Sequence, residues 1–542
     1  MTGTKRKILV WLGVIALALA VFAGWVMRGN PSDLDPMATT GKEPLLVEAD
    51  TEFIPSVGLV DPVGWAKGEA PKAAAGLAVT RFAEGLDHPR TVLALPNGDV
   101  LVAETNSPPR QASNAFTGFF MKLFMGRVGA GGESPNRIVL LRDADGDGAA
   151  EARFTLRSAG LASPSGMAWA AGKLYVANHN AVLAFDFAPG ATELTTEPKK
   201  IMDLPGGGNH WMRNLQLSPD GKQLYVAVGS ASNIGEDGMA IEQGRAAIWE
   251  LDLASGKSRQ YANGMRNPNG MDWNPSTGEL WATVQERDML GPDLVPDYLT
   301  NVPIGVQYGW PWVYWRDLMD WRVKDPMPEF LTEYSRKPEF ALGAHVSALG
   351  LRFAAGGQRL GPAYANGAFI ARHGSWNRKP LSGYDVVFVG FDANGNPLGK
   401  PQPVLTGFLS GKSNEAHGRP VWLAWDKGGG LLVSDDTGGV IWRVIAPITT
   451  ELPLGSMPAS SFTPPKSTKR PGWDKRIFME GSRVWPPART WPPETAALTA
   501  SAREAGRSSV NAYICELLCC FRLWLPEWLP RRGGAWRACQ TL

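Results

Sequence analysis

Cysteine and histidine are scarce in this sequence, and their distribution excludes several classes of protein. Of the 542 residues only four are cysteine and six are histidine. All four cysteines lie between Cys515 and Cys539, so disulfide bonds cannot hold together the chain before them. That part must be stable through its hydrophobic core. A Cys-x-x-Cys-His sequence is absent, which excludes covalently attached haem.

An excess of one charge is also missing. The formal net charge is +2 and no long basic run occurs, which argues against a nucleic-acid partner or a strongly acidic one. No Gly-x-Gly-x-x-Gly sequence follows a predicted strand, so the sequence offers no nicotinamide-binding fingerprint. What is abundant is glycine (62), proline (43) and tryptophan (22), a composition typical of many turns and short strands.

The N-terminus contains the one long apolar run. Lys5, Arg6 and Lys7 precede residues 8–27, which carry no charge and are long enough to cross a bilayer as a helix. The positive-inside rule keeps the basic flank in the cytoplasm and exports the rest of the chain. An uncleaved anchor is favoured, and a signal peptide cleaved near Ala18–Ala20 is the alternative. In both cases we expect an extracytoplasmic, periplasmic protein, in the first case anchored to the inner membrane by residues 8–27.

Composition divides the chain into four parts. Residues 1–30 form the membrane anchor or signal segment, residues 31–75 a linker and residues 76–447 the main domain. Residues 448–542 mix proline-rich pieces with Arg, Ser and scattered Trp and have no sustained period. We expect this last part to be a disordered or non-homologous extension on which the function does not depend.

The main domain repeats one hairpin pattern, in which a turn rich in Gly, Pro and Asn stands between two apolar stretches that alternate with a period of two. The six occurrences are Leu95–Ala103, Trp169–Val176, Leu217–Val226, Trp273–Trp281, Tyr364–Ile370 and Trp425–Val433. Recurrence without a helical period between the hairpins predicts propeller blades that carry long insertions. A β-sandwich is the competing all-β fold, but it would not repeat one hairpin six times.

We therefore predict an all-β fold, a six-bladed β-propeller preceded by one N-terminal transmembrane or signal helix. Closure of the ring would pair an early strand, Leu77–Phe82, with the last one, Val440–Val444. The tryptophans of the repeated hairpins, Trp169, Trp273 and Trp425, are expected in the core.

Polar segments flank the hairpins, where a propeller places residues at one end of its central channel. Four of them carry more His, Arg and Asn than a fold needs. They are Asn209–Asn214, Gly264–Gly270 with Gln285–Asp288, Ala371–Arg378, and Ala416–Pro420.

Several ordered motifs in these segments resemble one known family. The motifs are Arg266-Asn267-Pro268-x-Gly270, Glu286-Arg287-Asp288, Val295–Thr300, Tyr308-Gly309-Trp310-Pro311, His373–Arg378 and Ser434-Asp435-Asp436. Together they resemble the quinoprotein glucose/sorbosone dehydrogenases, with the sorbosone branch closest, over residues 76–444. The resemblance implies a six-bladed propeller that binds pyrroloquinoline quinone with a calcium ion. It also implies oxidation of a sugar or a sugar-derived aldehyde or alcohol.

The resemblance assigns roles to individual residues. His210 matches a histidine that removes the substrate's hydroxyl proton, a task suited to a neutral imidazole. Arg266, with Asn267 beside it, matches an arginine that stabilises negative charge growing on the quinone oxygen. Main-chain carbonyls just after the strand that ends near Glu286 match the calcium ligands, which here implies Asp288 and Met289.

The carboxylates of the cofactor require cations. Arg419 matches an arginine of the sixth blade, and Arg372 and Arg378 are candidates in the fifth. His345 and His373 lie in motif-bearing segments and are further candidates to contact the cofactor. The glucose-oxidising relatives place a lysine in the fifth blade, and this sequence departs from them there.

One motif stands apart from the rest. Asp143, Asp145 and Asp147 alternate as in a calcium-binding loop, with Glu151 at the ninth position, but Phe154 replaces the bidentate glutamate at the twelfth. A hairpin turn is the favoured interpretation, and a structural calcium site is the alternative.

Other functions remain open at this point. One is a calcium-dependent, lactonase-like propeller hydrolase, which would hold its metal with acidic and amide side chains from several blades. Another is a non-enzymatic, cell-surface binding propeller. For the dehydrogenase, the partners would be a small sugar or aldehyde and an external electron acceptor, either a quinone or a cytochrome.

Overall fold

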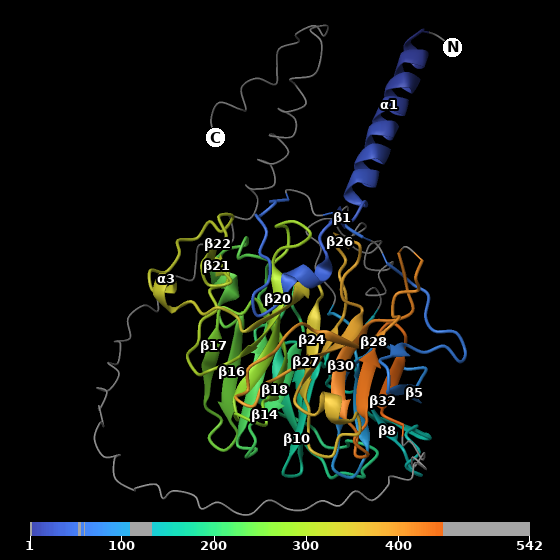
Figure 1. Ribbon diagram of the computed structural model, residues 1–542, viewed down its shortest axis with the longest axis vertical. Coiled ribbons are helices and arrows are strands. Elements are labelled where there is room, and N and C mark those ends of the chain that lie inside the picture. The colour runs from blue at the N-terminus through green and yellow to red at the C-terminus, as the bar shows by residue number, and fades with distance from the viewer. Residues whose placement is uncertain (1–2, 53–55, 59, 109–132, 413, 448–542) are drawn as a thin grey trace, which may run out of the picture. The chain divides into compact units, whose positions relative to one another are not determined.

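The predicted hairpins form the two innermost strands of six antiparallel sheets (Figure 1). The computed structural model describes residues 3–52, 56–58, 60–108, 133–412 and 414–447. The predicted C-terminal extension and its cysteines lie outside these residues. Contacts divide the chain into two units, Met1–Pro453 and Leu454–Leu542, of which the second lies outside the described residues.

Each sheet is one blade of the propeller, and the predicted six-bladed fold is confirmed. In blades 1 to 3 the strands are β6 (Pro89–Ala94), β7 (Val100–Glu104), β8 (Arg137–Arg142) and β9 (Ala152–Arg157); β10 (Gly166–Ala170), β11 (Lys173–Asn178), β12 (Ala181–Asp186) and β13 (Lys199–Asp203); and β14 (Arg213–Leu217), β15 (Gln223–Val228), β16 (Ala247–Asp252) and β17 (Ser258–Asn263).

Blades 4 to 6 follow the same plan, with a long insertion between the two outer strands of blade 4. Their strands are β18 (Asn267–Trp273), β19 (Leu280–Gln285), β20 (Pro296–Asn301) and β23 (Phe340–Ala344); β24 (Ala348–Phe353), β25 (Gly367–Arg372), β27 (Asp385–Gly390) and β28 (Gln402–Thr406); and β30 (Pro420–Trp425), β31 (Leu431–Asp435) and β32 (Val440–Ile445) with β5 (Ala78–Ala83).

The ring closes where the sequence predicts it. β5, from the start of the domain, pairs antiparallel with β32, from its end, with Val79 opposite Val444 and Arg81 opposite Trp442. The first strand of the domain therefore completes the last blade, so no blade edge is left open at the joint.

Two glycines let neighbouring blades approach each other closely. A Cβ at Gly166 in β10 would lie 2.3 Å from the Arg213 carbonyl oxygen of β14, and one at Gly270 in β18 would lie 2.3 Å from that of Leu349 in β24. Any larger residue would push these innermost strands apart. The glycine of the Arg-Asn-Pro-x-Gly motif is therefore needed for packing between blades.

The hairpin tryptophans are half-buried and pack against the hydrophobic core. Trp273 donates its indole N–H to the Leu217 carbonyl of the preceding blade (2.7 Å), and Trp425 does the same to Phe353 (2.9 Å). Trp169 donates to Phe187 (3.1 Å). An indole N–H needs an acceptor when it is removed from water, and a position at the blade edge supplies one.

The N-terminal region has two parts. Helix α1 (Gly3–Val26) is, among the described residues, the helix long and apolar enough to cross a membrane. The predicted linker 31–75 is instead part of the folded unit. Its short strands β2 (Thr40–Gly41) and β4 (Lys72–Ala73) pair with the outer strands β23 and β28, because those edges have free backbone groups.

We predict that a chain truncated after Pro447 folds as the full chain does. All blade strands are complete by Ile445, so truncation removes no ladder hydrogen bond of the propeller. Thermal unfolding followed by circular dichroism should give a midpoint within a few degrees of that of the full chain. A truncated chain that is insoluble or markedly less stable would contradict the predicted domain boundary.

Candidate functional site

A cavity of about 200 Å³ lies at the end of the propeller where innermost strands begin and second strands end. Four of the residues singled out in the sequence line it, namely His210, Arg266, Asp288 and His345. They come from blades 3, 4 and 5. The other lining residues are Gln285, Glu286, Asp297, Ser347, Trp376 and Asn377.

His210 is held in one tautomer. Its Nδ1 lies 2.9 Å from the Ser230 carbonyl oxygen and 3.0 Å from Ser230 Oγ. A carbonyl oxygen only accepts, so Nδ1 carries the hydrogen and Nε2 keeps its lone pair. Burial, reinforced by the Arg266 guanidinium, lowers the pKa of His210 well below 6.5. The imidazole is therefore neutral at physiological pH and can accept a proton at Nε2.

The buried Arg266 and the half-buried Asp288 form an ion pair beside His210, with Nη2 of the arginine 3.0 Å from Asp288 Oδ2. Arg266 also donates to the Asn233 carbonyl and side-chain oxygens and to the Glu286 carbonyl. Burial opposes ionisation of Asp288, but Arg266 and His345 hold the pKa of its carboxyl below its usual range. The arginine is thus fixed in place by the protein before any ligand binds.

His345 approaches Asp288 from blade 5. Its Nδ1 lies 3.3 Å from Asp288 Oδ1, and its Nε2 lies 2.9 Å from the Gly291 carbonyl oxygen. Burial would lower the pKa of His345, but the Asp288 carboxylate raises it overall. His345 and Ser347, which line the cavity, have positive φ (57° and 56°), as does Met289 (70°), so some backbone strain lies beside the cavity.

Two further lining residues are poised for polar contacts. Among the described residues, only the backbone N–H groups of Glu286 and Ala348 donate to Asp297, and burial raises the pKa of its carboxyl to about 7. Asn377 donates its amide N–H to Asp288, but its buried Oδ1 has no partner among the described residues. An unpaired buried acceptor is costly, and a bound molecule with a donor group would satisfy it.

A second group of charged residues, the arginine cluster, lies between blades 5, 6 and 1. It comprises Arg90, His373, Arg419 and Asp436. Asp436 accepts from Arg90 and lies 3.0 Å from His373 Nε2. Burial and the positive charge of Arg419 lower the pKa of His373 to about 4, so the ring is neutral at physiological pH. Arg90 also lies over the Trp211 ring, one residue from His210.

Arg419 differs from the other predicted arginines because its terminal nitrogens are available. Its Nε makes a long contact with the His373 carbonyl (3.4 Å) and its guanidinium carbon lies 5.8 Å from the Tyr384 ring centroid. Within the described part of the chain, no residue accepts from its Nη1 or Nη2. A carboxylate could therefore bind to this guanidinium in a bidentate manner.

Arg372 and Arg378 do not join the site. Arg372 is buried, donates to both oxygens of Asp385 and bonds the Leu342 carbonyl, so it braces blade 5. Arg378 pairs with Asp293 at 2.9 Å and also donates to the N-terminal segment at Ser32 and Leu34. Asn267 donates to Gln285, which lines the cavity, so it supports the site from behind.

The two carbonyls expected to bind calcium already have donors. Arg322 Nη1 lies 3.0 Å from the Asp288 oxygen and 2.9 Å from the Met289 oxygen. The Asp288 carbonyl also accepts from Asn233 Nδ2, and the Met289 carbonyl from the Glu52 N–H. A carbonyl oxygen has two lone pairs, so neither has one left for a metal ion. These carbonyls do not fit a calcium ion in this conformation.

The separate acidic motif forms the turn between β8 and β9. Ligand atoms of Asp143, Asp145, Asp147 and Glu151 lie within 4.8 Å of one another. These carboxylates also accept backbone N–H groups of their own turn, for example Gly146 to Asp143 (2.7 Å). The predicted turn is present, and the alternative of a structural calcium site stays open.

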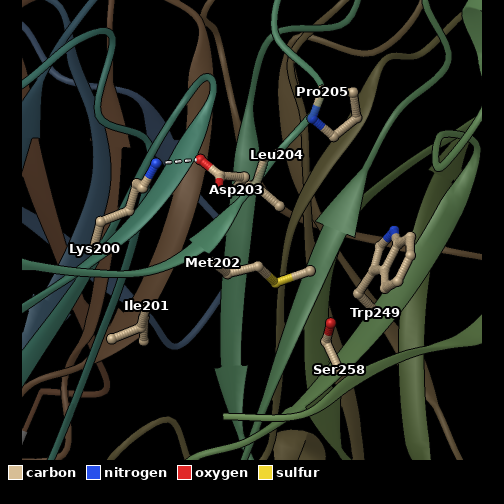
Figure 2. Close-up of a pocket in the computed structure, with 8 residues that line it drawn as sticks. All are labelled: Lys200, Ile201, Met202, Asp203, Leu204, Pro205, Trp249 and Ser258. Atoms are coloured by element: carbon tan, nitrogen blue, oxygen red, sulfur yellow. Dashed lines mark hydrogen bonds and ion pairs between the residues drawn. The ribbon is translucent and has the colours of Figure 1, made fainter.

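Two larger hollows lack comparable chemistry. One of about 320 Å³ lies between β13 and blade 3, where Lys200 and Asp203 pair with each other (Figure 2). Another of about 380 Å³ lies at the hairpin end of the channel, where Arg352 pairs with Asp272. Neither contains a histidine or a group of unpaired polar atoms.

Comparison with known proteins places the chain in a family. The TrAA12-like family model matches residues 140–295 and 329–446, together just over half of the chain. The chain belongs to the TrAA12-like family. The matched residues contain His210, Arg266, Asp288, His345 and most of the arginine cluster.

Related proteins and solved structures agree with the fold. A protein of Borreliella burgdorferi without an assigned function is 28% identical over 239 residues, 43% of this chain and 60% of that protein. A pyrroloquinoline quinone-dependent pyranose dehydrogenase of Coprinopsis cinerea is 30% identical over 152 residues, 24% of this chain but only 20% of the dehydrogenase. The chain therefore spans less than two thirds of either relative.

Two solved structures share the architecture. An iodide structure of the Trichoderma reesei carbohydrate-active enzyme family AA12 has a TM-score of 0.57 at 21% identity, covering 70% of this chain and 98% of that one. The holo form of the pyranose dehydrogenase PQQ domain from Coprinopsis cinerea has a TM-score of 0.55 at 19% identity, covering 71% and 100%. At these identities the likeness shows the propeller fold.

Sequence reasoning missed several residues of the site. The motifs of the family resemblance contain three of them, Asp297, Asn377 and Asp436, and could have identified them. Arg90, Asn233 and Arg322 lie outside every such motif, and only the fold brings them to the site.

We predict that Arg372 and Arg419 differ in their effect on stability. Arg372→Gln leaves the largely buried Asp385 carboxylate unpaired and should lower the free energy of unfolding by about 3 kcal/mol. Arg419→Gln removes no ion pair and should change it by less than about 0.5 kcal/mol. Denaturant unfolding of the two variants and the parent measures both values. Equal losses would mean that Arg419 has a structural role as well.

Proposed function

We propose that this TrAA12-like chain is a pyrroloquinoline quinone-dependent dehydrogenase of the sorbosone or aldose type. It oxidises a sugar or a sugar-derived aldehyde or alcohol and passes the electrons to an external acceptor. The holo propeller of the Coprinopsis pyranose dehydrogenase supports the cofactor by analogy of fold and by a short stretch of similar sequence. The sorbosone branch is supported by the ordered sequence motifs alone.

The observation that carries the proposal is the state of His210. A neutral imidazole, whose Nε2 has no hydrogen-bond partner in the described part of the chain, lines a cavity that also contains a fixed arginine. Alcohol or hemiacetal oxidation needs such a base to take the hydroxyl proton, because the same carbon must release a hydride. Ser230 keeps the hydrogen on Nδ1, so the ring accepts at Nε2 only.

When bound, the quinone would supply the hydride acceptor, and the chain's own residues would position and neutralise it. Arg419 would bind one of its carboxylates through the available Nη1 and Nη2. Arg266 would place positive charge close to His210 and the reacting atoms. Asn377 Oδ1, unpaired in the cavity, would accept a hydrogen bond from the cofactor or from a sugar hydroxyl.

The same geometry disfavours the other two functions. A propeller hydrolase needs free acidic side chains around a metal, but here Asp288 pairs with Arg266 and Glu286 accepts from Arg287. A binding propeller has no need of a histidine held in one tautomer or of a buried unpaired amide oxygen. No step of the proposed reaction is assigned to calcium, since the Asp288 and Met289 carbonyls have no free lone pair.

We predict that the purified full chain binds pyrroloquinoline quinone with similar affinity in the presence of a calcium chelator and in the presence of calcium. Tryptophan fluorescence quenching would measure binding, and a panel of aldoses and sugar aldehydes should bleach the bound quinone. Arg419→Gln should weaken binding about tenfold or more, since a charge-assisted hydrogen bond contributes about 1.5–3 kcal/mol.

Arg372→Lys is the matched control. It changes an arginine that lies away from the cavity, and lysine keeps the positive charge there. Failure to bind the quinone, or sugar oxidation with a nicotinamide cofactor alone, would overturn the proposed function. A large gain in affinity with calcium would show that the ion displaces Arg322 from the two carbonyls.

We predict that His210→Ala keeps its cofactor but reduces it roughly a hundred- to ten-thousandfold more slowly, the range for loss of a positioned base. Stopped-flow spectroscopy of the bound quinone with excess sugar measures this step. In the parent, the rate should stay level on lowering the pH to 6.5, because the depressed pKa keeps His210 unprotonated there.

His179→Gln is the control, since His179 does not line the cavity. A folded His210→Ala variant that holds the quinone and reduces it at the parent rate would remove His210 from the mechanism.

A further inference from the structure

The apolar helix α1 is joined directly to the rim of the cavity. Three residues separate Val26, the last of the helix, from β1 (Asn30–Pro31). β1 pairs in parallel with β26 (Arg378–Lys379), and the Asn30 N–H donates to the carbonyl of Asn377, which lines the cavity. A four-residue step spans at most roughly 14 Å.

The end of α1 is also held by neighbouring backbone. The Val57 N–H donates to the Val26 carbonyl (2.8 Å), and the next residue, Gly58, donates to Trp376 (2.6 Å). Trp376, like Asn377, lines the cavity. The helix therefore leaves the propeller at the cavity end and not from a distant edge.

The dimensions of α1 fit a bilayer. Its 24 residues, at 1.5 Å each, extend about 36 Å, against a hydrocarbon core of about 30 Å. Its apolar side chains are exposed along the whole length, for example Leu17 (66%) and Val21 (65%). No residue of the described propeller covers them, and lipid is the surrounding that suits them.

A second, independent feature lies at the same end. The segment between β20 and β23 forms the hairpin of β21 (Val313–Tyr314) and β22 (Leu318–Met319), followed by the short helix α3 (Leu331–Tyr334) (Figure 1). Arg287 fixes the hairpin through the Pro311 and Val313 carbonyls. Arg322 fixes it to the Asp288–Met289 turn beside the cavity.

This segment exposes three aromatic side chains. Trp321 is 84% exposed, Tyr334 69% and Phe330 51%. Trp and Tyr concentrate where membrane-bound proteins meet the lipid headgroups, because their rings are apolar at one end and polar at the other. Exposed apolar groups of this size on a fixed insertion mark a contact surface.

We propose that the cavity end of the propeller is seated on the membrane surface, held by α1 on one side and by Trp321, Phe330 and Tyr334 on the other. The partner is the lipid bilayer itself. In combination with the proposed function, this seating means that electrons leave the site at the membrane. The seating is argued without the quinone, so it can be tested separately.

Site-directed fluorescence in the full chain tests the proposal. The four cysteines are replaced by serine, and one new cysteine is introduced and labelled with an environment-sensitive nitrobenzoxadiazole dye. Trp321→Cys reports on the exposed aromatic side chains, and Trp25→Cys on the end of α1. Leu398→Cys is the matched control, because this residue is also exposed (48%) and follows β27 at the hairpin end of blade 5.

The labelled chains are reconstituted in vesicles of phosphatidylcholine and phosphatidylglycerol that contain a headgroup nitroxide quencher. We expect the dye at positions 25 and 321 to be quenched at least threefold more than at position 398. Quenching at 25 but not at 321 would show an anchored propeller whose cavity end is free of the membrane, and would overturn the proposal. Equal quenching at all three positions would overturn it too. Neither result depends on quinone binding.

Discussion

Pairing between β5 and β32 is the constraint on which the rest of this structure depends. It joins residues more than 350 positions apart and closes six separate sheets into one ring. Only in a closed ring do the innermost strands of blades 3 to 6 begin at the same end of one channel. His210, Arg266, His345 and Arg419 each lie just before such a strand. Their approach is therefore a consequence of closure and of the close blade contacts at Gly166 and Gly270.

Asp288 is the residue on which the charges of the cavity converge. Its carboxylate faces Arg266 and His345, its N–H donates to Asn233, and its carbonyl accepts from Arg322. The Asp288 carboxylate thus lies between Arg266 and His345, with the neutral His210 next to them. Burial and the Arg266 guanidinium lower the pKa of His210 and keep the ring unprotonated, while positive charge stays close to it. A site of this kind suits a reaction in which a proton leaves the substrate and negative charge grows nearby.

The insertion between β20 and β23 links the site to the surface of the protein. Its inner side supplies Arg322, whose guanidinium is held by both oxygens of Asp320 and closes the Asp288–Met289 turn. Its outer side presents Trp321, adjacent in sequence but almost fully exposed. The same few residues therefore shape the cavity and the surface proposed to meet the membrane, with Arg322 taking the carbonyls that the family resemblance assigns to calcium.

The fold followed from the sequence because a propeller is built from local signals. The alternating apolar stretches and turn residues of hairpins such as Leu217–Val226 and Trp425–Val433 act within a few residues of each other, so they can be recognised without any distant contact.

The histidine and arginine of the cavity were identified through motifs that surround them, as with Arg266-Asn267-Pro268. The free state of Arg419, the bracing role of Arg372 and the occupation of the Asp288 and Met289 carbonyls could not be foreseen. Each depends on which side chains from remote segments arrive at the same place, and hydrogen-bond partners are set by that packing.

The sequence by itself determined the six blades, their closure and the apolar helix, because these arise from periodicity. Only the tertiary structure decided which of four similar arginines has nitrogens left for a ligand.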